Sequence, residues 1–395
     1  MKKTLVAAAV LGTIAGSALA AEVTLYGVVD MGLAYSHVDS DRLSSMDRDS
    51  FSMESGQQAG SRWGLKGTEE LGNGLTVGFI LEDGFTADDG AESGSMFDRE
   101  SSLFLEGGFG KLAFGRMGSI NQGISSWGLG GNLSAFGTSF GSYSAQVANF
   151  VSTPGIWDNM IAYRSPTFAG FTVYAQYSMG SSGTNKHENE SDTDRYYALG
   201  MTYANGPFLG YLAVDSINYQ TYGLAGGVGN DIDDSLTVTL GGNYDFNVAK
   251  VFFGAQYFDE ARLSSIGGIV SDASLADQIY SGATAGTNVS LTNAKVKGYG
   301  VSLSASVPLG GGSGLFGVAY MDAEQSDFEK DFGVGEFDFT RWIVSAGYDY
   351  PLSKRTNVYA VASYMNDKVE PKGANADPEW NPSAYTFLVG MRHTF

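Results

Sequence analysis

The amino-acid sequence predicts an all-β protein, a transmembrane antiparallel β-barrel of about 16 strands. Three observations support this fold class: apolar residues alternate with polar ones, the chain ends on a strongly amphipathic segment, and a secretory leader precedes it. No apolar run after residue 21 reaches the ~20 residues that a membrane-spanning helix needs. A chain of this kind can cross a membrane only as a closed barrel, because hydrocarbon offers no water to unpaired backbone groups.

The last residues of the chain, 385–395, show the alternation most clearly. Apolar or aromatic side chains recur there with period two, which is the pattern of a β-strand with two unlike faces. One face carries Tyr385, Phe387, Val389, Met391 and Phe395. Soluble proteins seldom end on their most hydrophobic strand, since termini are usually exposed and frayed. This segment is therefore predicted to be the closing strand of a membrane barrel.

Residues 1–20 are predicted to be a secretory signal peptide. A basic start is followed by an apolar run from Leu5 to Leu19 and by the small-residue sequence Ala-Leu-Ala, which predicts cleavage before Ala21. The alternative, a single helical anchor, is disfavoured because the apolar run is shorter than the ~20 residues required. The remaining chain, 21–395, shows no break in composition and is predicted to form one domain.

Composition excludes several classes of protein. The 395 residues carry a formal net charge of −20, which becomes −22 once the two lysines of the leader are removed, so nucleic acid is not an expected partner. Cysteine is absent, which rules out a disulfide scaffold, a zinc–thiolate site and a catalytic thiol. The abundance of Gly (55), Tyr (22) and Phe (24) is typical of β structure rich in turns and aromatic residues.

Short turns and long connections alternate along the predicted strands. The first five strands are expected at about 23–36, 60–69, 75–85, 97–106 and 111–116. The long connections are expected at 37–59, 86–96, 117–158, 181–193, 218–234, 263–293, 325–337 and 366–382. This alternation places both termini and all short turns at one end, which is the organisation of an outer-membrane barrel.

The alternation also assigns side chains to faces. Leu25, Leu65 and Phe79 are predicted to face outward. The inward set of the first three strands is predicted to include Tyr26, Asp30, Arg62, Lys66 and Glu82. About 16 strands form a ring too wide for side chains to fill, so a polar, water-filled channel is expected.

Catalytic and metal sites find little support in the sequence. The three histidines, His37, His187 and His393, lie far apart and lack the serine or carboxylate partners that nucleophilic catalysis requires. No enzymatic activity and no cofactor are therefore expected. Acidic clusters in predicted loops allow two interpretations, calcium sites or solvated loops that share divalent ions with lipopolysaccharide phosphates. The second is favoured because a full ligand pattern is missing from both clusters: Asp39, Asp41, Asp47 and Asp49, and Asp231, Asp233 and Asp234.

Six local motifs occur in order at the predicted strands and cover essentially the whole mature chain. They are VTLYGVVD at 23–30, GSRWGLKGTE at 60–69, FGR at 114–116, YRSP at 163–166 with FAGF at 168–171, YPLSKRT at 350–356, and GMRHTF at 390–395. Together they resemble the Gram-negative general diffusion porins, most closely those of β-proteobacteria and their neisserial relatives. The resemblance implies a homotrimer of sixteen-stranded barrels in the outer membrane of a Gram-negative bacterium, through which ions and small hydrophilic solutes pass passively.

The resemblance also implies a pore constriction. In this family the third long loop folds into the lumen and faces a ladder of arginines, which Arg62, Arg116 and Arg164 match here. Lys66 lies two inward steps from Arg62 and would extend the ladder. Strict alternation places Arg116 on the same face as Phe114, so a bulge after Phe114 would be needed to turn Arg116 inward.

The third loop departs from the family pattern. Residues 118–157 contain no charged side chain, and the loop's first acid is Asp158. Glu82 on the wall is a second candidate pore acid. With so few carboxylates opposite the basic wall, we expect weak anion preference or near neutrality, shifting toward cations when Arg62 and Arg164 are replaced by glutamine.

The role of Phe395 and the function of the barrel each allow two interpretations. The family resemblance implies that Phe395 is part of the signal read by the barrel-insertion machinery, and the alternative is a residue of the interfacial aromatic girdle. For function, the leading hypothesis is a passive pore. The alternative is a non-conducting barrel with an adhesive or structural role, whose interior would be plugged by 117–158.

Overall fold

The structure is a computed structural model that describes residues 22–41, 47–180, 193–219, 222–223, 229–230, 233–270, 295–326, 337–372 and 379–395. The predicted signal peptide, together with His187 and Asp231, lies outside the described residues. Among the residues that the structure does describe, no helix has the length and apolar character needed to cross a membrane.

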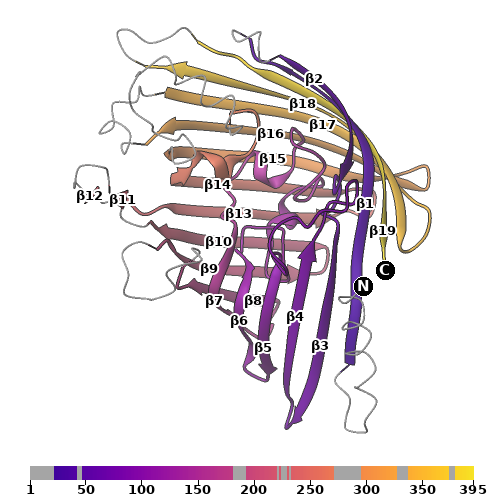
Figure 1. Cartoon of the computed structure of the whole chain (residues 1–395), viewed down its shortest axis with the longest axis vertical. Coiled ribbons are helices and arrows are strands. Elements are labelled where there is room, and N and C mark those ends of the chain that lie inside the picture. The colour runs from indigo at the N-terminus through magenta and orange to yellow at the C-terminus, as the bar shows by residue number, and fades with distance from the viewer. Residues whose placement is uncertain are drawn as a thin grey trace.

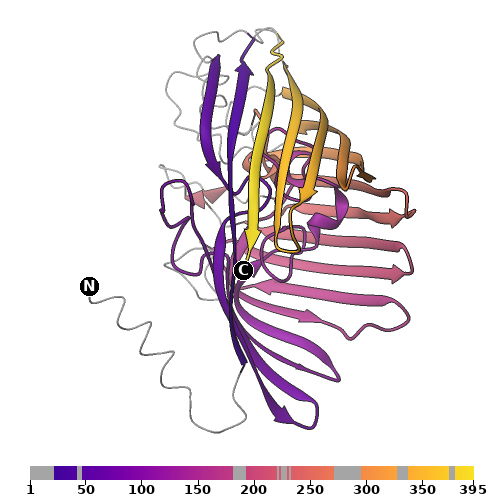
Figure 2. The same cartoon turned by 90° about the vertical axis from the view of Figure 1, so that its right-hand side faces the viewer.

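Antiparallel strands make up most of the described chain and close into a barrel with 16 strand positions (Figures 1 and 2). The main sheet contains seventeen strands, because β2 and β3 occupy a single strand position of the barrel one after the other. Its strands are β1 (Glu22–Asp39), β2 (Arg48–Ser55), β3 (Arg62–Gly72), β4 (Leu75–Gly84), β5 (Glu100–Gly107), β6 (Gly110–Gly118), β7 (Ile156–Arg164), β8 (Phe171–Ser178), β9 (Arg195–Asn205), β10 (Phe208–Asn218), β13 (Leu236–Asp245), β14 (Lys250–Arg262), β15 (Lys295–Leu309), β16 (Gly312–Gln325), β17 (Phe337–Pro351), β18 (Thr356–Pro371) and β19 (Ser383–Thr394). The short strands β11 (Tyr222–Gly223) and β12 (Gly229–Asn230) pair only with each other.

The first strand closes the ring. On one edge β1 pairs with β19, from Val28 opposite Thr394 to Asp39 opposite Ser383. On its other edge β1 pairs first with β3 and then with β2. Closure pairs the backbone groups that an open sheet would leave exposed at its edges. The predicted barrel of about 16 strands is therefore confirmed.

Most predicted strands agree closely with the structure, and the largest difference lies in the first long connection. This segment was expected to be loop over 37–59, but it contains the end of β1 and the whole of β2. Sequence reasoning missed β2 because its eight residues include only two large apolar side chains, Phe51 and Met53.

The two faces of the sheet differ as the alternation predicted. Outward side chains such as Leu25 (59% exposed) and Leu303 (56%) are apolar, whereas the inward Asp30 is fully buried. Aromatic rings gather near both ends of the strands, as in membrane barrels with two interfacial girdles. Near the short turns Phe171 contacts Tyr203. Near the long connections Tyr177 contacts Tyr197, and Trp342 contacts Tyr364.

Residues Ser119–Gly155, here called the L3 segment, connect β6 to β7 and lie across the inward face of β13 to β18. L3 contains the two short 3-10 helices η2 (Gly130–Leu133) and η3 (Val147–Asn149). Its backbone amides donate to small wall side chains, with Ala135 N–H 2.9 Å from Ser304 Oγ and Ala145 N–H 2.9 Å from Ser345 Oγ. These serines alternate with exposed apolar residues, so the contacts lie on the face away from the apolar belt.

Glycines in the wall allow L3 to pack directly on the backbone of the strands. A Cβ added at Gly317 of β16 would lie 2.8 Å from the Phe136 ring, and one added at Gly300 of β15 would collide with the Phe150 carbonyl. Equivalent collisions with L3 side chains would occur on β9 and β13, at Gly200 and Gly241. Real Cβ atoms do not approach this closely, so these positions form a glycine trough that seats the apolar side chains of L3.

A buried ion pair fixes the far end of L3. Arg341 of β17 and Asp367 of β18 are both fully buried and form a bidentate pair with distances of 2.7 and 2.8 Å. The other guanidinium donors reach the carbonyl oxygens of Asn149 in L3 (3.3 Å) and of Ile266 (2.7 Å) and Gly267 (2.9 Å) in the connection after β14. A buried charge is tolerated when its donors are all satisfied in this way.

Replacing Gly300 with alanine is expected to destabilise the barrel, because the new methyl group must displace Phe150 or the wall. Overpacking of this kind costs about 1–3 kcal/mol. Gly131 in L3 is the matched control, since a Cβ there meets nothing within 4 Å. The temperature at which each refolded variant loses its β-sheet circular dichroism measures the effect. Equal temperatures for Gly300→Ala and Gly131→Ala would contradict the tight seating of L3.

Candidate pore constriction

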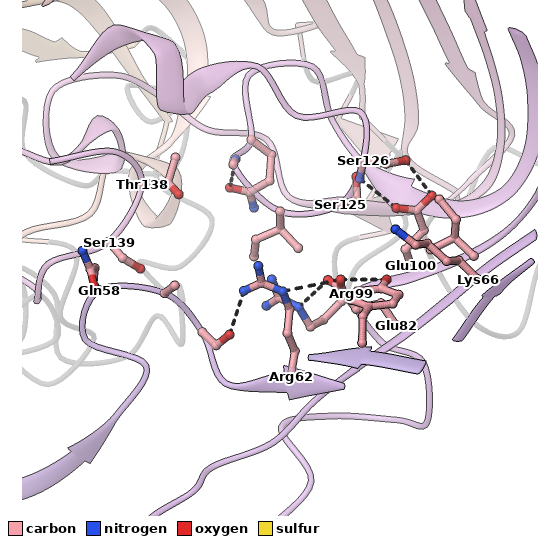
Figure 3. Close-up of a pocket in the computed structure, with 17 residues that line it drawn as sticks. Gln58, Arg62, Lys66, Glu82, Arg99, Glu100, Ser125, Ser126, Thr138 and Ser139 are labelled. Carbon is pink, nitrogen blue, oxygen red and sulfur yellow. Dashed lines mark hydrogen bonds and ion pairs between the residues drawn. The ribbon is translucent and has the colours of Figure 1, made fainter. Parts of the chain in front are cut away.

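A cavity of about 450 Å3 separates L3 from the inner wall near the start of the chain (Figure 3). Strands β1, β3 and β4 supply much of the wall side, and residues just before and at the start of β5 complete it. The wall contributes Tyr26, Arg62, Lys66, Ile80, Glu82, Arg99 and Glu100. L3 contributes residues 122–126 together with Thr138 and Ser139.

Strand periodicity brings the wall side chains together. Arg62, Gly64 and Lys66 are successive inward positions of β3, and Gly64 is opposite both Tyr26 on β1 and Glu82 on β4. A Cβ at Gly64 would lie 2.7 Å from the Tyr26 ring. The glycine therefore leaves the space through which the Tyr26 hydroxyl reaches Glu82, at 3.0 Å.

Glu82 lies between two arginines. Its Oε1 accepts a hydrogen bond from Arg99 Nε at 2.8 Å, and its Oε2 is 3.5 Å from Arg62 Nε (Figure 3). Arg62 also donates to the Gly60 carbonyl at 2.9 Å. The cluster holds both guanidinium groups against the wall, where they face the cavity.

Glu100 fastens L3 to the wall. Its carboxylate accepts the backbone N–H of Ser126 at 2.7 Å and the Ser126 hydroxyl at 2.9 Å, and it also accepts the hydroxyl of Ser102 at 2.7 Å. Glu100 is only 1% exposed. Both carboxylates of the cavity are thus engaged by donors, while its cations number three: Arg62, Lys66 and Arg99.

Comparison with known proteins identifies the family. A model described as Gram-negative porin matches residues 7–370. An outer membrane porin protein of Bordetella pertussis is 33% identical over 415 aligned residues, which cover 100% of each chain. The chain belongs to the Gram-negative porin family.

Other relatives agree with this assignment. Outer membrane porin protein 32 of Delftia acidovorans is 28% identical across 100% of both chains. Among solved structures, the anion-selective porin from Comamonas acidovorans is 26% identical with a TM-score of 0.64, covering 95% of this chain and 100% of that chain. This protein is an outer-membrane porin of a Gram-negative bacterium that forms a passive, water-filled channel for ions and small hydrophilic solutes. Family and fold point to a channel and not to an enzyme.

Arg116 of the porin does not line the cavity, which corrects the sequence-based assignment. Across β5 and β6, Arg116 is opposite Ser101 and shares a face with the exposed Phe114. A bulge is present, but it lies on β7, where Asp158 and Asn159 (φ 51°) together oppose Arg116. Because the extra residue is in the partner strand, β6 keeps its alternation and Arg116 stays outward.

Asp158 likewise does not line the cavity, and it pairs with Arg116. Arg116 Nη1 lies 2.6 Å from Asp158 Oδ1, and Arg116 Nε donates to the Asp98 carbonyl at 2.7 Å. Neither Arg116 nor Asp158 is among the residues that line the cavity. The sequence could not reveal this pair, since the two residues meet only through the register of β6 with β7.

Arg164 faces inward but at a different level of the porin. It stands at the end of β7 opposite Lys111, close to the short turn between β5 and β6. Its guanidinium is 3.4 Å from Glu106, and both side chains are more than a third exposed. The predicted arginine ladder is thus divided, with Arg62 and Lys66 in the cavity and Arg164 near the strand end.

Arg99 takes the place in the cavity that sequence reasoning gave to Arg116. It precedes β5, so alternation along the strand does not determine its direction. The backbone N–H of Arg99 donates to the Glu82 carbonyl at 3.2 Å, which aims the side chain along β4. The sequence feature that marks Arg99 is the run Asp98, Arg99 and Glu100, in which a cation lies between two acids where β5 begins.

Phe395 covers the outer side of β1. Its backbone exchanges hydrogen bonds with Gly27, at 3.2 and 3.1 Å. A Cβ at Gly27 would collide with the Phe395 ring, and Phe395 remains 44% exposed. The terminal ring thus rests on the outside of the seam between the first and last strands.

The histidines and acidic loops form no metal centre in the part of the porin that the structure describes. His37 pairs with Asp49 at 3.0 Å, and His393 is 2.9 Å from the Thr356 hydroxyl. Asp47 accepts two hydrogen bonds from Ser40, which hold the pKa of Asp47 below its ordinary value. Asp47 and Asp49 are thus engaged by hydrogen-bonding partners within the protein.

Proposed function

We propose that the cavity between L3 and the wall is the eyelet of the channel, and that its fixed charge gives a weak preference for anions. The observation that supports this is the charge count, three cations against two carboxylates, with no charge contributed by L3. Glu82 is shared by two arginines and Glu100 is occupied by L3. Lys66 has its ammonium over the Tyr26 ring at 5.3 Å and adds positive charge further along the wall.

The negative overall charge of the chain favours cations, but its effect on the passage is weakened by solvent screening. The formal charge of −20 is carried largely by acids in the long connections and at strand ends. Charges exposed to solvent are screened within about 8–10 Å at physiological salt. A narrow passage is less screened, so the groups that line it dominate selection. The anion-selective porin from Comamonas acidovorans, 26% identical to this chain, supports the same sign.

We also propose that the porin is a homotrimer whose contact includes the outer face of β5 and β6. The outward Arg116–Asp158 ion pair supports this surface. Charged side chains that face lipid are costly, and burial against another copy removes that cost. Leu103 and Phe114 lie beside the pair and are 56% and 45% exposed in the single chain.

Two further proposals concern the envelope. We infer that Phe395 acts in insertion of the barrel, as the family resemblance implies, and its exposed position on the seam supports access by an insertion factor. We also propose that Asp39, the last residue of β1, and Asp41, two residues beyond it, share divalent ions with lipopolysaccharide phosphates in the outer leaflet.

Replacing Arg62 and Arg99 by glutamine is expected to shift the channel toward cations, because the cavity is then left with one cation, Lys66, against the two carboxylates Glu82 and Glu100. Reversal potentials in a salt gradient should show the chloride-to-potassium permeability ratio falling by about threefold or more. Arg164→Gln removes an inward cation outside the cavity and is the matched control. Strong cation selectivity of the unmodified channel, left unchanged by the double substitution, would contradict the proposed eyelet.

Introducing arginine at Leu103 is expected to prevent trimer formation, because a charge would then be buried between subunits. Leu240 on the outer face of β13 is also 56% exposed and provides the matched control. Light scattering after chromatography of protein refolded in detergent reports the mass of each assembly. Loss of the trimer in Leu240→Arg, or its survival in Leu103→Arg, would refute the proposed contact.

Deleting Phe395 is expected to reduce insertion into the outer membrane of cells more than it destabilises barrels refolded in detergent. The amount of folded protein in outer-membrane fractions, compared with the thermal stability of refolded protein, separates recognition from packing. Equal losses in the two assays would instead support a role in the aromatic girdle alone.

A further inference from the structure

Strands β2 and β3 are separated by a few residues that leave the sheet, and these residues lie inside the barrel. Residues Gln57–Gly60, here called the inner strap, leave the sheet after Gly56, whose φ is +77°. The chain rejoins the sheet at Ser61, whose carbonyl accepts the N–H of Phe85 at 3.1 Å. Figure 3 shows Gln58 near Ser139, at the side of the cavity away from Lys66.

Asp30 clips the strap to the wall. The side chain is fully buried, and its Oδ2 accepts the backbone N–H groups of Gln58 and Ala59, each at 2.7 Å. The other oxygen, Oδ1, accepts the Tyr359 hydroxyl at 2.6 Å. Hydrogen bonds to a carboxylate are about twice as strong as those between neutral groups. One side chain of β1 thus fixes two consecutive backbone amides of the strap.

The side chain of Gln58 extends the attachment across the seam of the barrel. Its Nε2 donates to Asp349 Oδ2 on β17 at 2.8 Å, and its Oε1 accepts Asn357 Nδ2 of β18 at 2.7 Å. Asn357 also donates to Asp349 Oδ1 at 2.7 Å, which closes a ring of three side chains. Strands β19 and β1 lie between β18 and the strand position of β2 and β3, from which the strap departs. Gln58 therefore spans the seam between β19 and β1 on the inside of the barrel.

The strap also touches the eyelet from two sides. The Gly60 carbonyl accepts Arg62 Nη1 at 2.9 Å, and the Gln57 carbonyl accepts the Phe140 N–H of L3. The Phe140 ring meets the Tyr359 ring edge-on at 5.6 Å. L3, the strap and the wall therefore form a continuous border around the cavity, to which Gln58, Ala59 and Gly60 contribute lining atoms.

We infer that the inner strap is a second rim of the eyelet, and that Asp30 sets the aperture by holding it. This inference rests on the proposed eyelet. The aperture then depends on two segments with separate attachments, L3 on the glycine trough and the strap on Asp30. In this scheme Asp30 is a positioning residue: it holds the backbone that borders the passage and, through Gly60, the guanidinium of Arg62.

Single cysteines test whether the strap borders the passage, because the chain contains no other cysteine. Ala59→Cys on the strap and Ser139→Cys on L3 both replace lining residues. A negatively charged methanethiosulfonate reagent, added to trimers in planar bilayers, is expected to lower the conductance of each by about twofold or more. Ser353→Cys in the turn between β17 and β18 is the control, which should be labelled without a change in current.

The loss of current in the two cysteine variants distinguishes a failure of the strap as a rim from a failure of the proposed eyelet. If complete labelling, checked by mass spectrometry, lowers the current at Ser139→Cys but not at Ala59→Cys, the strap is not a rim and the eyelet still stands. If labelling affects neither variant, the eyelet and the inference both fail.

Asp30→Asn tests the clip. Its conductance is expected to fall by about a third, with greater open-channel noise, because the released strap moves into the passage. Loss of a negative charge alone would instead favour anions and raise the current. If Asp30→Asn does not assemble, Gln58→Ala removes the contacts with Asp349 and Asn357 and should show the same noise. An unchanged current in an assembled Asp30→Asn, or in Gln58→Ala when that variant stands in, would overturn the assigned role of Asp30.

Discussion

The requirement that every backbone amide in hydrocarbon find a partner within the protein governs the whole structure. Strand β1 meets it at the seam by pairing with β19 on one edge and with β2 and β3 on the other. Once the ring is closed, the outward face must be apolar and the inward face is free to be polar. The wide interior that results is narrowed by backbone that leaves the sheet, and that backbone needs polar partners on the wall. Asp30, Glu100 and Arg341 meet this need.

Much of the fold could be predicted from the sequence, because strand periodicity is local. Alternation correctly placed Arg62, Lys66 and Glu82 on the inner wall. It failed where facing depends on another strand: the bulge that decides the direction of Arg116 lies on β7, and Arg99 precedes the first paired residue of β5. Contacts between segments distant in sequence, such as Asp30 with the 57–60 backbone, leave no periodic signal. The role of the glycines at 200, 241, 300 and 317 could not be predicted either, because it depends on the path of L3 through the barrel.

The cavity between L3 and the wall differs from a simple opposition of an acidic loop and a basic wall. Acid and base are both on the wall, where Glu82 bridges Arg62 and Arg99, while L3 presents hydroxyl, amide and backbone groups. A solute in the cavity therefore meets charge on one side and neutral hydrogen-bonding groups on the other. Glu100, a carboxylate of the wall, accepts the Ser126 N–H and so attaches L3.

The seating of L3 has a consequence for biogenesis. The strands that receive most of this segment, β13 to β18, follow it in the chain by about 80 residues or more. During synthesis and export, L3 therefore emerges before its docking surface exists. Narrowing of the lumen must await the C-terminal half of the barrel, and an incomplete barrel would leave L3 without its partners on β13 to β18, with Phe136 and Phe150 uncovered. Such an intermediate exposes apolar surface, and the lumen reaches its final width only when the last strands of the ring are in place.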